Sequence, residues 1–219
     1  MSGNIVIYGA GGFGREIALM LREINQAKET WNIVGFCDDG KRKDEEIDGL
    51  KVLGGFDHLN STTEKLAVAV AIADPSIRKK IATALTNSNL HFPVLVHPHA
   101  LIGDTGRNQF EKGVIITAGT IFTTGISMDA FAIINLSCTI GHDAKIGKFC
   151  TLMPACHISG NVVIEEGVLI GTGASVLQNL NIGQWAKIGA GAVVTKNILA
   201  GQTAVGVPAR EIFTNDKRV

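Results

Sequence analysis

The chain has 219 residues, a length that allows one or two domains with well-buried cores. Lys and Arg together number 20, as do Asp and Glu, so no net charge attracts the protein to nucleic acid or to an anionic membrane surface. The N-terminus lacks a basic segment followed by an apolar one, and no run of about 18 apolar residues occurs. We therefore expect a cytoplasmic protein that binds no nucleic acid and does not insert into a membrane.

The first half of the chain alternates strand and helix patterns. Residues 4–11, NIVIYGAG, form an apolar run that ends in glycines, which is typical of a parallel strand buried on both faces. In residues 14–24, Ile17, Leu21 and Ile24 lie on one stripe of an expected helix. We expect two more strands at residues 31–39 and 65–74. A helix that begins at Pro75 is expected over residues 75–88, and an exit strand or linker over residues 91–98. These patterns predict an α/β, Rossmann-like βαβ domain over residues 1–95.

A six-residue repeat replaces this alternation after Phe110. Every sixth residue is apolar, and a small or modest apolar residue follows most of these anchors four positions later. The anchors are Phe110, Ile116, Phe122, Met128, Ile134, Ile140, Ile146, Leu152, Ile158, Ile164, Ile170, Val176, Ile182, Ile188 and Val194. Glycine directly follows several anchors, and we assign the turns of the repeat to these glycines. The repeat predicts a chain that coils on itself with the anchors inside.

The four cysteines are expected to be reduced and buried. Cys138, Cys150 and Cys156 fall at the small inward position of the repeat, and Cys37 ends an expected strand. No two of them form a CxxC pair, which argues against a zinc-ribbon or thioredoxin-like site.

The repeat resembles that of the hexapeptide-repeat acyltransferases, whose fold is a left-handed parallel β-helix. The resemblance implies an all-β domain with a C-terminal tail over residues 96–219, in which three hexapeptides form one triangular coil. Residues 18 apart then stack about 4.8 Å along the axis. His142 and Gly160 stack in this way on one edge, with His142 facing outward, and Thr172 and Ala190 stack on another edge. If subunits pack side by side, these two edges of neighbouring chains form a shared active site.

The whole chain resembles the PglD/NeuD-type sugar acyltransferases, because a short nucleotide-type domain precedes the β-helix and several of their motifs occur in order. These motifs are YGAGGFGRE, FCDD, IADPSIRKKI, IINLSCTIGHDAKIG, SGNVVI and VGVPAR. The resemblance implies a homotrimer that uses acetyl-CoA to acetylate the amino group of a nucleotide-linked amino-deoxysugar, such as a UDP- or dTDP-4-amino-4,6-dideoxyhexose. Its setting would be bacterial surface-glycan or glycoprotein sugar biosynthesis. Sialic-acid O-acetyltransferases are close relatives, so sugar O-acetylation remains an alternative.

Catalytic roles follow from the same resemblance. His142 would be the general base that takes a proton from the attacking amine, and Asp143 would raise its basicity. The backbone N–H of Gly160 would stabilise the oxyanion of the tetrahedral intermediate. Asn135 would hold the acceptor sugar or the thioester.

The implied cofactor-binding residues are Thr151, Gly160, Thr172 and Ala190. Family members often have His where this chain has Thr151, so the chain departs from the family at this contact with CoA. Thr172 and Ala190 correspond to positions that contact the pantetheine arm through backbone groups.

The glycine loop GAGGFG matches the GxGxxG pattern through Gly9, Gly11 and Gly14, which lets the backbone approach phosphates at the start of a helix. By the resemblance, the nucleotide sugar is held by this loop and by the acidic pair Asp38 and Asp39, and the segment after Ala73 also contributes. The implied substrate-binding residues are Gly11, Gly12, Phe13, Gly14, Asp38, Asp39 and Ala73.

Three other classes of protein are alternatives. A γ-type carbonic anhydrase needs three zinc-binding histidines, and the repeat offers only His142 and His157, so we expect no metal. An NAD-dependent dehydrogenase would explain the glycine loop, yet about 95 residues leave no complete dinucleotide domain. A non-catalytic β-helix scaffold would need neither His142 nor the N-terminal domain. We expect His157 to be structural or peripheral, and His97 and His99, in the linker, to have no role.

Overall fold

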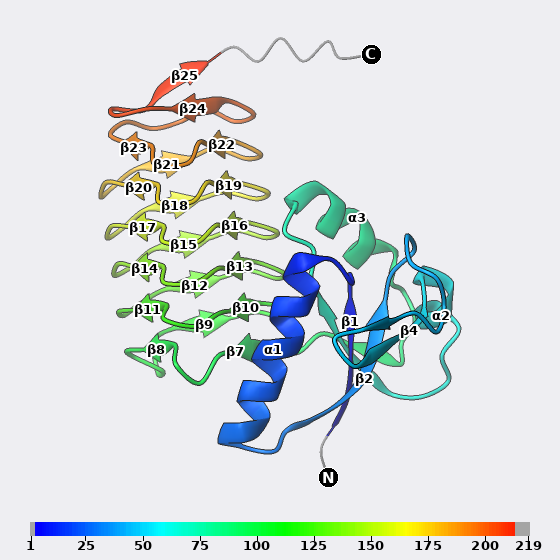
Figure 1. Ribbon diagram of the computed structural model, residues 1–219. Helices are drawn as coiled ribbons and strands as arrows, with labels where there is room; N and C mark the ends of the chain where they lie inside the picture. The colour runs from blue at the N-terminus through cyan, green and yellow to red at the C-terminus, as the bar shows by residue number, and fades with distance from the viewer. Residues whose placement is uncertain (1–2, 213–219) are drawn as a thin grey trace, which may run out of the picture.

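The computed structural model describes residues 3–212, which form an α/β domain packed against the side of a parallel β-helix (Figure 1). Both parts of the expected fold are confirmed. Of the expected C-terminal tail, residues 213–219 lie outside the described residues. None of the helices within residues 3–212 is both long and apolar enough to span a bilayer.

A mixed sheet in the order β3-β4-β2-β1-β5-β6 forms the N-terminal domain. The mutually parallel strands are β1 (Gly3–Tyr8), β2 (Trp31–Cys37), β4 (Leu50–Gly54), β5 (Leu66–Val70) and β6 (Leu90–His91), and β3 (Glu46–Ile47) pairs antiparallel with β4. Ile5, Val6 and Ile7 of the central strand are fully buried, because successive side chains enter the clusters on opposite faces of the sheet.

The helices are α1 (Gly12–Ala27), α2 (Phe56–Asn60) and α3 (Pro75–Ala84). On α1, Ile17 and Leu21 are fully buried, as their shared stripe predicts. Pro75 is the first residue of α3, and the Asp74 carboxylate caps this helix by accepting from the Ser76 N–H at 2.9 Å. Four elements are not apparent in the sequence, namely β3, β4, α2 and β6, because none of them has an apolar run like that of β5 and each forms by pairing or packing with its neighbours.

Three parallel sheets make the sides of the β-helix. The first contains β7 (Leu95–Val96), β10 (Ile115–Ile116), β13 (Ile133–Ile134), β16 (Thr151–Leu152), β19 (Leu169–Ile170), β22 (Lys187–Ile188) and β24 (Thr203–Val205), with β25 (Arg210–Ile212) added antiparallel. The second contains β8 (Leu101–Ile102), β11 (Ile121–Phe122), β14 (Thr139–Ile140), β17 (His157–Ile158), β20 (Ser175–Val176) and β23 (Val193–Val194). The third contains β9 (Gln109–Phe110), β12 (Ser127–Met128), β15 (Lys145–Ile146), β18 (Val163–Ile164) and β21 (Asn181–Ile182).

The six-residue anchors occupy the centre of the β-helix. Ile116 to Val194 at this spacing are at most 3% exposed, and Phe110 is half-buried. Partners on neighbouring strands, such as Ile140 and Ile158, are 18 residues apart, which confirms the expected stacking. The inward cysteines Cys138, Cys150 and Cys156 are fully buried and unbridged, as expected.

The turn residue of each corner differs from the expectation. Glycines directly after the anchors, such as Gly141, have no left-handed φ; a Cβ on Gly141 would instead lie 2.6 Å from the Gly160 nitrogen of the next coil. The left-handed position is three residues after the anchor, and Asp143 occupies it with a φ of 59°. The glycine after the anchor therefore permits close stacking of coils, while the residue two places later makes the turn.

The first β-helix sheet is the side that the N-terminal domain covers. Leu95, Ile115 and Ile133 project from this sheet into the apolar cluster that includes α1. The chain passes from the N-terminal sheet to the β-helix between β6 and β7, next to the expected domain boundary. His97, for which no role was expected, is 4% exposed, and its Nε2 lies 2.7 Å from Glu23 Oε2 on α1. It therefore connects the two domains.

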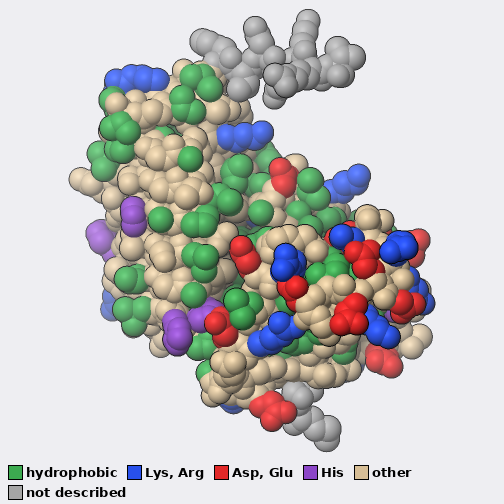
Figure 2. Space-filling model, viewed as in Figure 1, with side chains coloured by type: hydrophobic (Ala, Val, Ile, Leu, Met, Phe, Trp, Pro, Cys, Tyr) green, Lys and Arg blue, Asp and Glu red, His purple; other side chains and the backbone are tan. Residues whose placement is uncertain are grey.

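The second sheet has an uncharged outer face. Its outward residues are Leu101, Ile121, Thr139, His157, Ser175 and Val193. In Figure 2, Lys, Arg, Asp and Glu gather on the N-terminal domain, whereas the β-helix presents mainly apolar and uncharged surface with histidines along one side. In this view the charged side chains are thus concentrated away from the visible surface of the β-helix.

Candidate active site

His142 and Asp143 lie at the corner between β14 of the second sheet and β15 of the third. His142 Nδ1 is 2.9 Å from Asp143 Oδ2, a hydrogen bond in which Nδ1–H donates to the carboxylate. With the proton on Nδ1, Nε2 carries the lone pair that a general base needs. The side chains are 64% and 65% exposed, so they face outward as the repeat predicts and are accessible to a ligand.

Two glycines provide the space for this pair. A Cβ on Gly160, one coil further along, would lie 2.3 Å from His142 Nε2, so the imidazole rests against a bare Cα. A Cβ on Gly125, one coil before Asp143, would lie 2.6 Å from Asp143 Oδ1. The predicted site does not include Gly125. The 18-residue stacking could have identified this glycine, because it lies 18 residues before Asp143.

Backbone donors are available at three of the predicted positions. Within residues 3–212, the N–H groups of Gly160, Thr172 and Ala190 donate to no backbone carbonyl. Thr172 and Ala190 are exposed, whereas Gly160 is buried because the His142 ring covers it. These groups can donate to a ligand carbonyl or oxyanion that reaches the corner.

One chain does not bring all the predicted residues together. His142 and Gly160 lie at the corner between the second and third sheets, whereas Asn135, Thr172 and Ala190 follow strands of the first sheet and lie at the corner between the first and second sheets. The two corners are at opposite ends of β14. Within one chain these two groups of residues therefore do not meet at a single corner.

Thr151 lies in β16, on the side that the N-terminal domain covers, and is 0% exposed. Its hydroxyl donates to the Ala73 carbonyl at 2.7 Å and accepts from Arg78 Nη2 at 2.8 Å. Because the Thr151 side chain has no exposed surface and makes both hydrogen bonds inside the chain, its hydroxyl is not free for CoA, and any contact of this residue with CoA stays a prediction. The repeat places Thr151 outward, but the N-terminal domain covers that surface. The carbonyl of Ala73 belongs to the same interface, and its contact with substrate stays a prediction.

A pocket of about 490 Å³ opens at the carboxyl ends of β1, β2 and β5, where parallel α/β sheets bind ligands. Asp38 and Asp39 both line it. Asp38 accepts from two backbone N–H groups at 2.8 Å, and Asp39 accepts from the Phe56 N–H at 2.8 Å and from the Tyr8 hydroxyl. Burial raises the pKa of Tyr8, and the hydrogen bond to Asp39 raises it further. The predicted acidic pair therefore holds the loops around the pocket in place and presents its remaining lone pairs to a ligand.

The residues of the glycine loop have different roles. Gly9 makes the turn with a φ of 103°, and a Cβ on Gly14 would lie 1.8 Å from the Gly9 carbonyl oxygen, so Gly14 serves the packing of α1 against β1. Phe13 is half-buried in the cluster that α1 forms with the sheet. Gly11 and Gly12 are exposed at the N-terminus of α1, with no atom within 4 Å of an added Cβ. Phosphate contact is thus best suited to Gly11 and Gly12.

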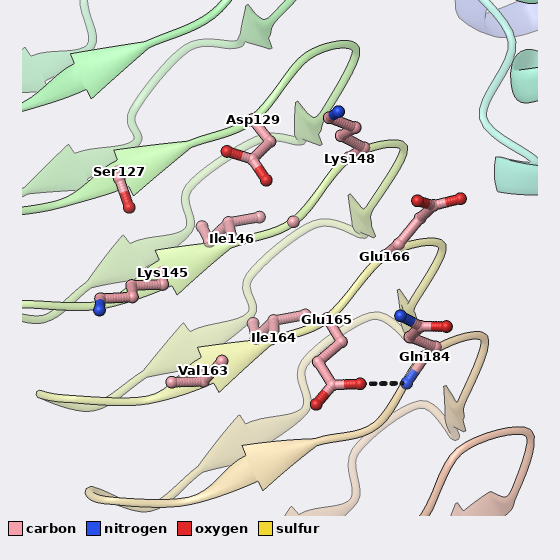
Figure 3. A pocket seen from close by; sticks show the side chains of 11 residues that line it. Ser127, Asp129, Lys145, Ile146, Lys148, Val163, Ile164, Glu165, Glu166 and Gln184 are labelled. Carbon is pink, nitrogen blue, oxygen red and sulfur yellow. Dashed lines mark hydrogen bonds between the residues drawn. The ribbon is translucent and has the colours of Figure 1, made fainter.

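A further hollow of about 380 Å³ lies on the third sheet and was not apparent from the sequence. Figure 3 shows charged side chains of both signs along it, from β12, β15 and β18 and the corners after them. Lys145 comes three residues after His142, and Glu165 accepts from the Gln184 N–H at 3.1 Å. The hollow therefore starts beside the corner that carries the His142–Asp143 pair.

In the part of the chain that the structure describes, no three His, Cys, Asp or Glu side chains gather in a way that could hold a metal ion. The second histidine of the repeat, His157, is engaged with its neighbour, since its Nδ1 lies 2.9 Å from Thr139 Oγ1. The described residues thus offer no zinc site of the kind that a carbonic anhydrase needs.

Known proteins share both domains. Residues 4–85 match the PglD N-terminal domain family, and residues 161–196 match the bacterial transferase hexapeptide (six repeats) family. GDP-perosamine N-acetyltransferase of Escherichia coli is 34% identical over 215 residues, which cover 94% of this chain and 95% of that enzyme.

Solved structures match nearly the full length of the chain. The acetyltransferase domain of PglB from Neisseria gonorrhoeae, in complex with acetyl coenzyme A, has a TM-score of 0.87 and 28% identity, and the match covers 97% of this chain and 100% of that one. PerB from Caulobacter crescentus, in complex with CoA and GDP-perosamine, has a TM-score of 0.85 and 27% identity, with 96% and 98% covered.

Proposed function

The chain belongs to the nucleotide-sugar N-acetyltransferases that join a PglD N-terminal domain to hexapeptide repeats, and we propose that it transfers the acetyl group of acetyl-CoA to the amino group of a nucleotide-linked amino-deoxysugar. The observation that carries this proposal is the exposed His142–Asp143 pair, in which the Nδ1 hydrogen bond leaves Nε2 as a base. The acetyl-CoA of the PglB domain and the GDP-perosamine of PerB support the two co-substrates.

The residues of the pair perform the proton transfers. As the sugar nitrogen bonds to the thioester carbonyl carbon, His142 Nε2 takes a proton from that nitrogen, and Asp143 stabilises the imidazolium that forms. The carbonyl oxygen becomes an oxyanion, for which the Gly160 N–H is the donor. When the intermediate collapses, the C–S bond breaks and the proton passes to the sulfur. The products are the N-acetylated sugar and CoA-SH.

The N-terminal domain is the part that holds the acceptor. Its pocket lies at the carboxyl ends of parallel strands and is bounded by the acidic pair, while Gly11 and Gly12 offer backbone donors at the start of α1. A nucleoside diphosphate needs both kinds of group, one for the base or ribose and one for the phosphates.

A homotrimer completes the site in this proposal. The corner with Asn135, Thr172 and Ala190 would face the corner with His142 in a neighbouring copy, and the uncharged outer face of the second sheet suits contact between copies. Analytical ultracentrifugation measures the assembly, and a monomer at the concentration of the assay would contradict the shared site.

The test is release of CoA-SH from acetyl-CoA in the presence of GDP-, UDP- or dTDP-linked amino sugars, with sialic acid as the control for O-acetylation. His142→Asn is expected to lower kcat about 10²- to 10⁴-fold, since it removes the base. His91→Asn is the matched control, because His91 is also an exposed histidine and lies on β6, outside the β-helix. The proposal is wrong if no amino sugar is acetylated, or if the two variants have equal activity.

A further inference from the structure

Arg78 is the largest fully buried side chain at the junction of the two domains, with 1% of its surface exposed. It lies on α3 of the N-terminal domain, and its guanidinium reaches into the first β-helix sheet. It donates to the carbonyls of Ile72, Ala73, Phe131, Phe149 and Cys150 and to the Thr151 hydroxyl, at 2.5, 3.0, 2.9, 2.7, 3.0 and 2.8 Å. We call this set of contacts the Arg78 clamp. It joins the loop after β5 to the β-helix.

The clamp is unusual because the charge is buried without a carboxylate. Within residues 3–212, no carboxylate lies within salt-bridge distance of Arg78. Burial lowers the pKa of its guanidinium to about 9, which leaves the group charged at neutral pH. Its N–H donors are all used, one of them shared between acceptors, so the planar fork fits this arrangement of carbonyls and an ammonium does not.

The same helix forms a wall of the nucleotide pocket with its other face. Ile77, Ile81 and Ala84 line the pocket, whereas Arg78 points into the interface. Ile72, whose carbonyl the clamp holds, also lines the pocket, and its side chain lies against Gly9 of the glycine loop. The clamp therefore fixes two walls of the pocket relative to the β-helix.

We propose that Arg78 is a positioning residue, which sets the orientation of the nucleotide pocket relative to the edges of the β-helix and thereby the distance from the acceptor amine to His142. The proposal rests on the proposed function for its kinetic consequence. The orientation itself is a property of the chain. The hydrogen bond from the Thr151 hydroxyl to the Ala73 carbonyl crosses the interface next to the clamp, whereas the ion pair of Lys79 with Glu166 lies beside it and is open to solvent.

The experiment compares Arg78→Lys, Thr151→Val and Lys79→Ala in the full chain. Thr151→Val keeps the shape of the side chain and removes one acceptor of the clamp together with the hydrogen bond to the Ala73 carbonyl, so it loosens the same loop and serves if Arg78→Lys does not fold. Isothermal titration with GDP and UDP measures the affinity of the pocket for nucleotides, and CoA-SH release measures turnover. In Arg78→Lys we expect kcat to fall about 100-fold, as for a misplacement of about 1 Å, with nucleotide Kd and the KM for acetyl-CoA within twofold of the unaltered chain. The kcat of Thr151→Val should be about 10-fold lower than that of the unaltered chain, and the kcat of Lys79→Ala should stay within twofold of it.

Hydrogen exchange provides the readout that does not depend on activity. The amides of α3, the helix that carries Arg78, should exchange faster in Arg78→Lys and Thr151→Val, while those of β1 keep their protection. Unchanged exchange in α3 overturns the clamp. A loss of kcat accompanied by an equal loss of nucleotide affinity also overturns the proposal, because Arg78 would then be shaping the pocket itself. If the unaltered chain acetylates no acceptor while the exchange result holds, the proposed function fails and the orienting role of Arg78 stands.

Discussion

Gly160→Ala tests whether the bare Cα of the next coil holds His142 in place. The added Cβ would lie 2.3 Å from Nε2, 2.6 Å from Cε1 and 2.8 Å from Cδ2 of the imidazole. Ordinary contact starts at 3.4 Å, so the ring must move by about 1 Å. Gly160 has no left-handed φ, and the imidazole is an exposed side chain that can swing away. The substitution therefore perturbs the base and spares the fold.

A displacement of about 1 Å of a catalytic group lowers kcat about 100-fold, which corresponds to about 2.7 kcal/mol of transition-state free energy. The assay is CoA-SH release at saturating acetyl-CoA, with the melting temperature as the check on folding. Gly106→Ala is the matched control, because its added Cβ meets no atom closer than 3.5 Å.

A double variant separates the effect on His142 from any other effect. In a His142→Asn background, Gly160→Ala should change kcat less than twofold, because the group that it displaces is already gone. A kcat for Gly160→Ala equal to that of Gly106→Ala would refute the reasoning, and so would a full 100-fold loss in the His142→Asn background.

Asp143→Asn should lower kcat about 5-fold, far less than His142→Asn, because the pair is exposed and water screens it; a loss as large as that of His142→Asn would contradict this ranking. Dialysis against EDTA should leave CoA-SH release unchanged, and loss of activity that zinc restores would reveal a metal requirement. Burial raises the pKa of Cys37 and of Cys150 to about 12, so the folded protein keeps protons that the unfolded chain releases above about pH 9. The free energy of unfolding, measured with urea, should therefore decrease from pH 9 towards pH 12 by about 1.4 kcal/mol per pH unit for each thiol. The variant with Cys37→Ala and Cys150→Ala should show a flatter decrease, and an identical slope would exclude the thiols as its cause.

Much of the fold is readable from local sequence. β1, β2, β5, α1 and α3 have apolar runs or stripes of the expected period, while the short β3, β4, α2 and β6 have none. The prediction of the corner turns was wrong. A glycine after the anchor suggests a turn, but position 141 needs a glycine because the backbone of the next coil leaves no room for a Cβ. That backbone belongs to Gly160, 19 positions away.

In the candidate site, the repeat likewise predicts the positions of some residues but not the surroundings of others. His142 is outward because the repeat leaves its position free, and Gly160 lies against it because the coil has 18 residues, so both follow from counting. Thr151 is outward by the same count, yet Arg78 and Ala73 enclose it. No count within the repeat reveals this, because the enclosing residues belong to another domain.

The sequence by itself determined the β-helix, its buried anchors and the outward corner with His142 and Asp143, because a repeat states the same local preference many times and the stacking distance follows from its length. Only the tertiary structure decided which side of the β-helix the N-terminal domain covers, that Thr151 belongs to that interface, and that Arg78 holds the pocket against the coils. Such contacts join residues more than 50 positions apart through geometry that occurs once in the chain, so no period records them.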